Sequence, residues 1–118
     1  MSQWLTPDLH VKSLSKASEW ELTKKLVYMY QGEPLEVPAG TQTDFASIPR
    51  ALRWRFNING KTRRAAVLHD FLYGTKWKTR KECDAVFKSA MRDCGVSRYN
   101  AWVMWVGVRG GGWTRGRW

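Results

Sequence analysis

Short runs of aromatic and β-branched residues, separated by turn residues, occupy the first half of the chain. Such runs lie at 20–30 (WELTKKLVYMY) and 35–37 (LEV), and they are typical of β-strands. Between them, residues 31–34 (QGEP) indicate a turn, so the pattern predicts a β-hairpin over 20–37. Residues 41–49 mix small and apolar positions, which favours an ordered loop.

In the second half of the chain, apolar positions recur at helical spacing. Residues 63–73 form the first such segment, and Gly74 is expected to end that helix as its C-terminal cap. Four residues share the apolar face of this helix: Ala65, Leu68, His69 and Leu72.

Two further helices are expected after it. Thr79 and Glu82 form a capping box, which predicts the start of the second helix, and Gly95 ends it. Ser97 is expected to cap a third helix that runs through Val108 and is apolar on nearly all sides. The apolar stripe of the second helix consists of Cys83, Val86, Phe87, Ala90 and Cys94.

The connection between the first two helices is short, since it covers only residues 74–78, and this makes them antiparallel neighbours. The expected fold class is α+β, with an N-terminal β-hairpin or small antiparallel sheet followed by three helices around a central helix hairpin. We expect one domain over 1–118. It divides into a strand and loop part (1–49), a helical part (60–108) and a basic tail rich in Trp and Gly (109–118).

Composition adds a strong positive charge to this picture. The 118 residues include 20 Lys and Arg against 10 Asp and Glu, which gives a net charge of +10, and they include 8 Trp. Such a chain is attracted to polyanions, so nucleic acid and an anionic membrane surface are both candidate partners. No apolar run approaches the roughly 20 residues of a spanning helix, so we expect no transmembrane segment.

The two cysteines are not expected to pair. Cys83 and Cys94 lie in one predicted helix, where about 1.5 Å of rise per residue separates them by about 16 Å. This exceeds the reach of a disulfide. Unpaired thiols indicate synthesis in a reducing cytosol.

Four polar residues gather at the predicted helix hairpin. His69 faces the neighbouring helix, and Asp84 lies at the flank of that helix's apolar stripe. A carboxylate beside an imidazole fixes its tautomer and stabilises the imidazolium, which suits His69 as a general base. Tyr73, four residues after His69, is placed to donate to the same carboxylate. Asp70 points about 100° away, towards a metal or an arginine.

Each of these residues also has a structural interpretation. A histidine on an apolar helix face is commonly a core residue with its hydrogen bonds satisfied. Asp84 is spaced to pair with Arg80, and Asp70 with Arg63 or Arg64, as ordinary helix-surface pairs. At this point both interpretations stay open.

The motif His69-Asp70-Phe71-Leu72-Tyr73, followed by Asp84-Ala85-Val86-Phe87, resembles the catalytic helix pair of phospholipases that cleave the sn-2 ester, especially small bacterial members. The resemblance covers about twenty residues. It implies that His69 is the base, Asp70 a calcium ligand, and Asp84 and Tyr73 the groups that orient His69. The chain has neither the glycine-rich calcium loop nor the disulfides of those enzymes.

A second resemblance covers nearly the whole chain. The segments 37–40 (VPAG), 43–50 (TDFASIPR), 64–73 (RAAVLHDFLY) and 81–87 (KECDAVF) are similar to a small family of uncharacterised proteins encoded by tailed bacteriophages and prophages. It implies a phage origin and synthesis in a bacterial host cytoplasm. Association with the virion is a further expectation. Asp44, in the shared TDFASIP motif, becomes a second candidate metal ligand. Its alternative role is that of a turn residue capping Ala46 or Ser47.

Basic and aromatic residues concentrate before the first helix and at the end of the chain. Such a mixture can bind anionic lipid headgroups, or stack on bases and neutralise phosphates. Trp102 and Trp105 are expected in the core. For the tail (109–118), the alternative to a docking surface is a solvated chain end. The expected docking surface consists of Arg53, Trp54, Arg55, Arg109, Trp113, Arg115, Arg117 and Trp118.

The leading hypothesis is a bacteriophage protein that acts at the host envelope when the phage enters or lyses the cell. In this hypothesis the protein is a phospholipase-like hydrolase with a His/Asp dyad and calcium. The alternative is a non-enzymatic tail or virion accessory protein that docks on anionic lipid or other phage proteins. A nucleic-acid-binding protein is the third hypothesis, based on charge alone.

Overall fold

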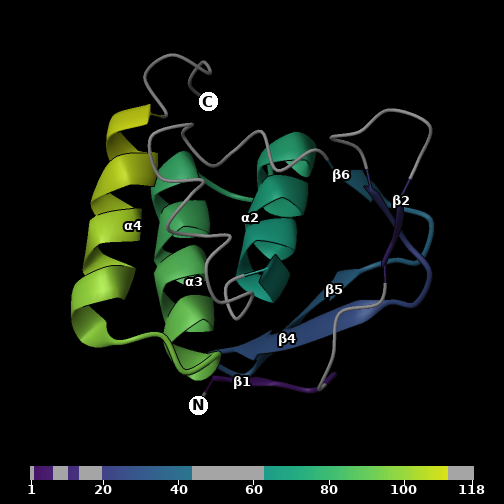
Figure 1. Cartoon of the computed structure of the whole chain (residues 1–118), viewed down its shortest axis with the longest axis horizontal. Coiled ribbons are helices and arrows are strands. Elements are labelled where there is room, and N and C mark those ends of the chain that lie inside the picture. The colour runs from purple at the N-terminus through teal and green to yellow at the C-terminus, as the bar shows by residue number, and fades with distance from the viewer. Residues whose placement is uncertain (1, 7–10, 14–19, 44–62, 112–118) are drawn as a thin grey trace.

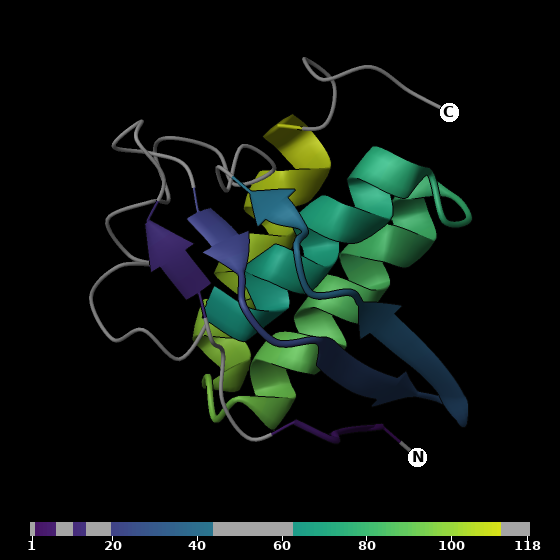
Figure 2. The same ribbon diagram turned by 90° about the vertical axis from the view of Figure 1, so that its right-hand side faces the viewer.

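The helices form one side of the molecule and the strands the other (Figures 1 and 2). The computed structural model describes residues 2–6, 11–13, 20–43 and 63–111. Its strands are β1 (Gln3–Trp4), β2 (Val11–Ser13), β3 (Trp20–Leu22), β4 (Leu26–Tyr30), β5 (Glu33–Val37) and β6 (Gln42–Thr43). Its helices are α2 (Arg63–Thr75), α3 (Arg80–Asp93) and α4 (Arg98–Gly111). This arrangement confirms the expected α+β class.

The strands form two small antiparallel sheets, in the orders β1-β4-β5 and β2-β3-β6. The run at 20–30, expected as one strand of the hairpin, is therefore divided between the two sheets. The hairpin itself is confirmed as β4 and β5, in which Tyr30 pairs with Glu33. Its turn is only Gln31 and Gly32, both with positive φ (49° and 83°), as in a type I′ turn.

Pro34, expected in the turn, lies within β5 instead. A proline cannot donate a backbone hydrogen bond, so strands accept it at a sheet edge. β5 lies at the edge of its sheet, which makes the position compatible with pairing to β4. The two-residue turn leaves no other place for this residue.

The end of α2 differs from the sequence expectation. Gly74 lies inside the helix, which continues to Thr75, and Lys76 takes the left-handed conformation with φ 52°. The Lys76 N–H donates to the Tyr73 carbonyl (3.2 Å), and the Trp77 N–H donates to the Leu72 carbonyl (3.1 Å). These two bonds form a Schellman motif, which satisfies the last carbonyls of α2 and turns the chain towards α3.

The other helix boundaries follow the sequence signals more closely. The Thr79 hydroxyl accepts the Glu82 N–H (3.1 Å), and the Ser97 hydroxyl accepts the Asn100 N–H (3.2 Å). Gly95 follows α3 with φ 90°, as expected. α4 extends to Gly111, however, so Arg109 lies in its last turn rather than in a tail.

α3 lies between α2 and α4 (Figure 1), and α2 is buried on nearly all sides, including Ala66 and Val67. α4 contacts the core through Ala101, Met104 and Val108. Trp102 lies on the other face of α4 and is 50% exposed, so the expectation that it is a core residue is wrong. Trp105 is partly buried. No helix in the described part of the chain is long and apolar enough to cross a bilayer.

The sheet β1-β4-β5 is joined to α3 by two aromatic side chains. The Trp4 indole N–H donates to the Ala90 carbonyl (3.2 Å). The hydroxyl of Tyr28, which has no exposed surface, lies 2.6 Å from the Ser89 hydroxyl and donates to Asp93 Oδ2 at 2.6 Å. Burial raises the pKa of Tyr28, and the Asp93 carboxylate adds to the effect. The phenol therefore stays a donor at neutral pH.

Tyr28→Phe should lower the free energy of unfolding by about 1–2 kcal/mol, because the ring is kept and only the hydrogen bonds to α3 are lost. Urea unfolding followed by circular dichroism measures the change. Tyr30→Phe, in the same strand but only partly buried, is the matched control. Equal stability of the two variants would contradict the role of the Tyr28 hydroxyl.

Both cysteines are free, in agreement with the sequence expectation. Burial raises the pKa of the Cys83 thiol to about 11. We therefore expect Cys83 to resist a thiol reagent at pH 8 in the folded protein, while the partly buried Cys94 reacts slowly. Timed labelling with peptide mass spectrometry distinguishes the two thiols. Equal labelling rates in the native state would contradict this, whereas both thiols should react rapidly in urea.

Candidate functional site

His69 lies in the middle of the helical layer with no exposed surface. It is on the apolar face of α2 that the sequence indicates, and this face packs on α3. Its Nε2 lies 2.6 Å from Asp84 Oδ1, in hydrogen-bonding geometry. The rings of Tyr73 and Phe87 flank the imidazole at 4.3 and 4.7 Å between centroids. The ring is thus held in one orientation.

Asp84 is the centre of the site and is also fully buried. Its Oδ1 accepts the Tyr73 hydroxyl (2.7 Å) as well as His69, and its Oδ2 accepts from an Arg109 guanidinium nitrogen (3.1 Å). The carboxylate from α3 is therefore contacted by side chains of α2 and α4. A buried carboxylate needs such donors, because burial without them costs several kcal/mol.

Tyr73 is a hydrogen-bond donor in this arrangement. Burial raises the pKa of its hydroxyl, and the hydrogen bond to the Asp84 carboxylate raises it further. The Tyr73 hydroxyl therefore keeps its proton at neutral pH and donates a hydrogen bond to Asp84. The structure thus brings together three of the expected site residues: His69, Asp84 and Tyr73.

Arg109 is a member of the site that the sequence did not indicate. It was expected in the docking surface, but its place in the last turn of α4 brings it to Asp84, and its side chain is 31% exposed. No pattern in the sequence signalled this position, because glycines follow Arg109 and glycine disfavours helix. The alternative helix pair between Asp84 and Arg80 is not formed in the described part of the chain. There, Arg80 Nη1 is buried without a hydrogen-bond partner.

Asp70 faces a different neighbour, as its position beside His69 predicts. Its Oδ2 accepts the Thr43 hydroxyl (2.7 Å), which links α2 to β6. Arg64, an expected alternative partner, instead donates to the Thr6 carbonyl (2.9 Å) and stacks on the Trp4 ring. Asp44, the other candidate metal ligand, directly follows Thr43 in the sequence and lies outside the described residues.

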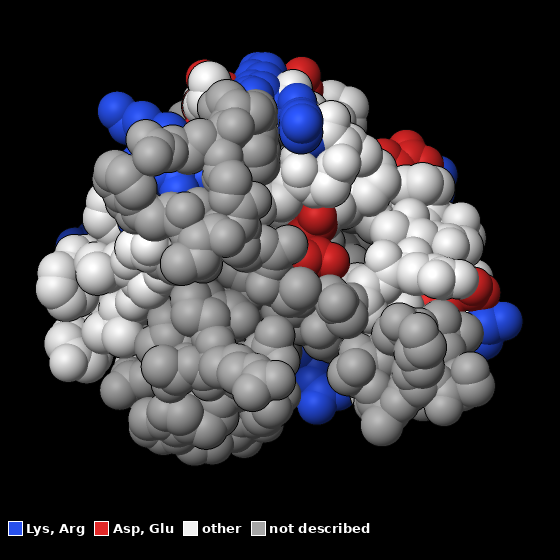
Figure 3. Space-filling model, turned by 90° about the horizontal axis from the view of Figure 1, so that it is seen from above, with Lys and Arg blue, Asp and Glu red and all other residues white. Residues whose placement is uncertain are grey.

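The described residues do not by themselves form a calcium site. Calcium takes six to eight oxygen ligands, several of them carboxylates. In the described part of the chain, no three His, Cys, Asp or Glu side chains gather to hold a metal ion. Figure 3 shows acidic atoms near the centre of one face, and both acidic and basic side chains towards its edges.

Most of the expected docking surface lies outside the described part of the chain. Arg53, Trp54, Arg55, Trp113, Arg115, Arg117 and Trp118 all lie outside the described residues. Arg109 is the exception, and its guanidinium is directed to Asp84. Arg109 therefore belongs to the network around Asp84, while part of its side chain stays exposed.

Arg109→Met should lower the free energy of unfolding by about 1–3 kcal/mol, because it keeps most of the side-chain volume but removes the donor to a buried carboxylate oxygen. Arg98→Met removes the same charge from an exposed position in α4 and should change stability by less than about 0.5 kcal/mol. Urea unfolding of both variants checks the difference. Similar losses would contradict a specific role for Arg109 at Asp84.

All residues of this network except Arg109 lie in a segment that matches a known family. The family is described as a protein of unknown function, DUF1353, and it matches residues 20–108. No curated protein and no solved structure matches the chain. The matched segment spans β3 to β6, α2 and α3 and most of α4, so the chain belongs to the DUF1353 family, as its resemblance to a small uncharacterised family indicates.

Proposed function

We propose that this protein is a hydrolase in which His69 acts as a general base, assisted by Asp84 and Tyr73. The observation that carries the proposal is the contact of 2.6 Å between His69 Nε2 and Asp84 Oδ1, combined with the Tyr73 hydroxyl on the same oxygen. A neutral histidine that donates from Nε2 has its basic lone pair on Nδ1. Nδ1 is then the atom that accepts a proton.

The proposed reaction is ester hydrolysis. Nδ1 of His69 takes a proton from water while the water oxygen adds to the ester carbonyl, and the imidazolium then returns this proton to the leaving alcohol. Asp84 stabilises the imidazolium. Tyr73 and Arg109 hold the carboxylate in place, so they act as positioning residues.

Phospholipid is the proposed substrate class. The resemblance of His69-Asp70-Phe71-Leu72-Tyr73 and Asp84 to sn-2-cleaving phospholipases supports it, as does the net charge of +10, which favours anionic membranes. We place this activity at the bacterial envelope, when a phage enters or lyses its host. The resemblance to phage-encoded proteins supports that context and a virion association.

One requirement follows from the burial of His69. Its exposed fraction is 0%, so water and substrate reach the ring only if neighbouring residues move. Opening of this kind on the microsecond-to-millisecond scale is common at enzyme sites. In an enzyme that hydrolyses lipid esters, contact with the membrane is a suitable trigger for this opening.

The same burial favours a second candidate function. A network with no exposed surface at His69 or Asp84 is also what a non-enzymatic phage component would use to hold three helices in register. In that case the protein is a tail or virion accessory component, and stable copurification with phage particles is expected.

Incubation with phospholipid vesicles, with fatty-acid release measured by mass spectrometry, tests the enzyme. His69→Gln should reduce release by at least about 100-fold, because it removes the base. Tyr73→Phe should reduce the rate while retaining the fold, and Tyr30→Phe is its matched control. Calcium and chelator arms test the metal that the phospholipase resemblance implies.

The outcomes separate the two candidates. No release by the wild-type protein in either arm, or equal release by His69→Gln, would show that the hydrolase proposal is wrong. Copurification with virions would then support the accessory component. Circular dichroism of each variant establishes that a loss of release is not a loss of folding.

A further inference from the structure

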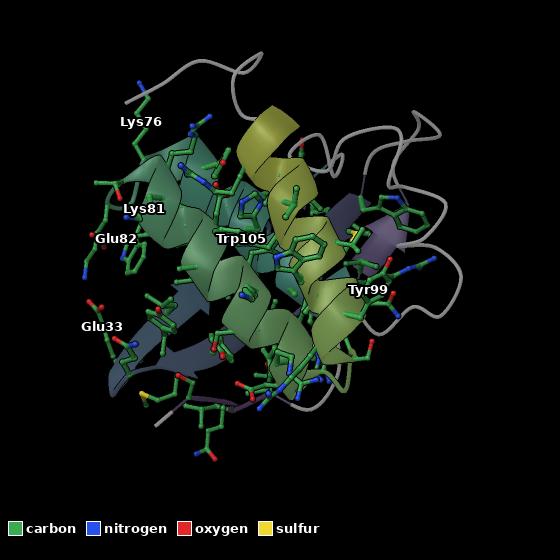
Figure 4. All side chains as sticks on the ribbon, turned by 90° about the vertical axis from the view of Figure 1, so that its left-hand side faces the viewer. Glu33, Lys76, Lys81, Glu82, Tyr99 and Trp105 are labelled. Atoms are coloured by element: carbon green, nitrogen blue, oxygen red, sulfur yellow. The ribbon has the colours of Figure 1, made fainter. Side chains whose placement is uncertain are left out.

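The outward face of α4 is aromatic and apolar rather than polar. Tyr99 is 67% exposed, Trp102 50% and Val106 43%, and their spacing places them in one row along the helix. We call these three residues the α4 stripe. Figure 4 shows Tyr99 on the outer side of α4, away from α3. A helix that is apolar on its solvent side as well as its core side is typical of contact with another phase or molecule.

A cationic pocket lies beside this stripe, between α3 and α4. It has a volume of about 450 Å³ and is lined by Lys88, Arg92, Arg98 and Trp102. The Lys88 ammonium group also lies over the Trp105 ring, 5.1 Å from its centroid. We call this the α3–α4 pocket. Three cations and an indole in one hollow suit a phosphate group attached to an apolar body.

No Asp or Glu is among the residues that line the pocket in the described part of the chain. Asp93, next to Arg92 in the sequence, accepts the hydroxyl of Tyr28 and is thereby directed to the sheet. α4 itself contains no Asp or Glu. Arg92 donates to the Val96 carbonyl (2.6 Å), which fixes its guanidinium at the end of α3.

We infer that the α4 stripe and the α3–α4 pocket together form a docking surface for an anionic phospholipid bilayer. The phosphate of one headgroup occupies the pocket, while Tyr99, Trp102 and Val106 enter the interfacial region. Trp and Tyr are enriched at that depth of a bilayer, and Lys and Arg interact with anionic headgroups.

Lipid fits these residues better than single-stranded nucleic acid does. Bases stack on aromatic rings, which would use Tyr99 and Trp102 but leave Val106 exposed. A bilayer interface accommodates all three members of the stripe. The role of the bilayer as the source of substrate rests on the proposed function, whereas docking itself is measured without any reaction.

Cosedimentation with vesicles of phosphatidylglycerol and phosphatidylcholine, compared with phosphatidylcholine alone, tests this surface. Each cation near an anionic surface contributes about 1 kcal/mol, so Lys88→Gln with Arg98→Gln should weaken partitioning about 30-fold. Trp102→Ala should weaken it as well. Lys24→Gln with Lys25→Gln removes two exposed charges from the turn before β4 and should change partitioning less than about twofold.

Three results would overturn the inference. The first is absence of binding to the anionic vesicles, and the second is an equal loss of partitioning in the pocket and control variants. The third is a pocket-dependent affinity for a labelled single-stranded oligonucleotide without affinity for vesicles. The His69→Gln variant separates this inference from the proposed function. It should bind vesicles like the wild type, and pocket-dependent docking without any lipid hydrolysis would support the surface while the hydrolase proposal fails.

Discussion

A carboxylate without exposed surface is the constraint on which the helical layer depends. Asp84 has to receive donors inside the protein, because water does not reach it. His69, Tyr73 and Arg109 supply those donors, and they come from the two helices on either side of α3. Any rotation or shift of one helix would leave a charged oxygen without a partner. The network therefore determines how the three helices are aligned, whether or not it also has a chemical role.

The core of the site was accessible from the sequence because its geometry is local. His69 and Tyr73 are four residues apart on one helix, and a short connection places Asp84 opposite them. Arg109 and the contact between Thr43 and Asp70 were not accessible. Those contacts depend on where a helix ends and on how a sheet packs, and neither has a signature in the spacing of residues.

The errors at the level of the fold have similar causes. Gly74 was the expected cap because glycine adopts positive φ readily, but the hydrogen bonds of the turn place Lys76 in that conformation. Trp102 is expected in the core, but Ala101, Met104 and Val108 form the packed face of α4. Residue types predicted that these helices exist. Tertiary packing and turn hydrogen bonds decided which residue ends a helix and which residues form its buried face.

The Schellman motif at the end of α2 also has a consequence for how the site is assembled during folding. It makes α2 and α3 a hairpin in which Tyr73 and Asp84 are separated by 11 positions, whereas Arg109 is 25 positions from Asp84. The entropy of loop closure makes the longer connection less favourable by about 0.7 kcal/mol. The half of the network formed by α2 and α3 is thus the part with the lower closure cost, and Arg109 of α4 completes the network across the longer connection.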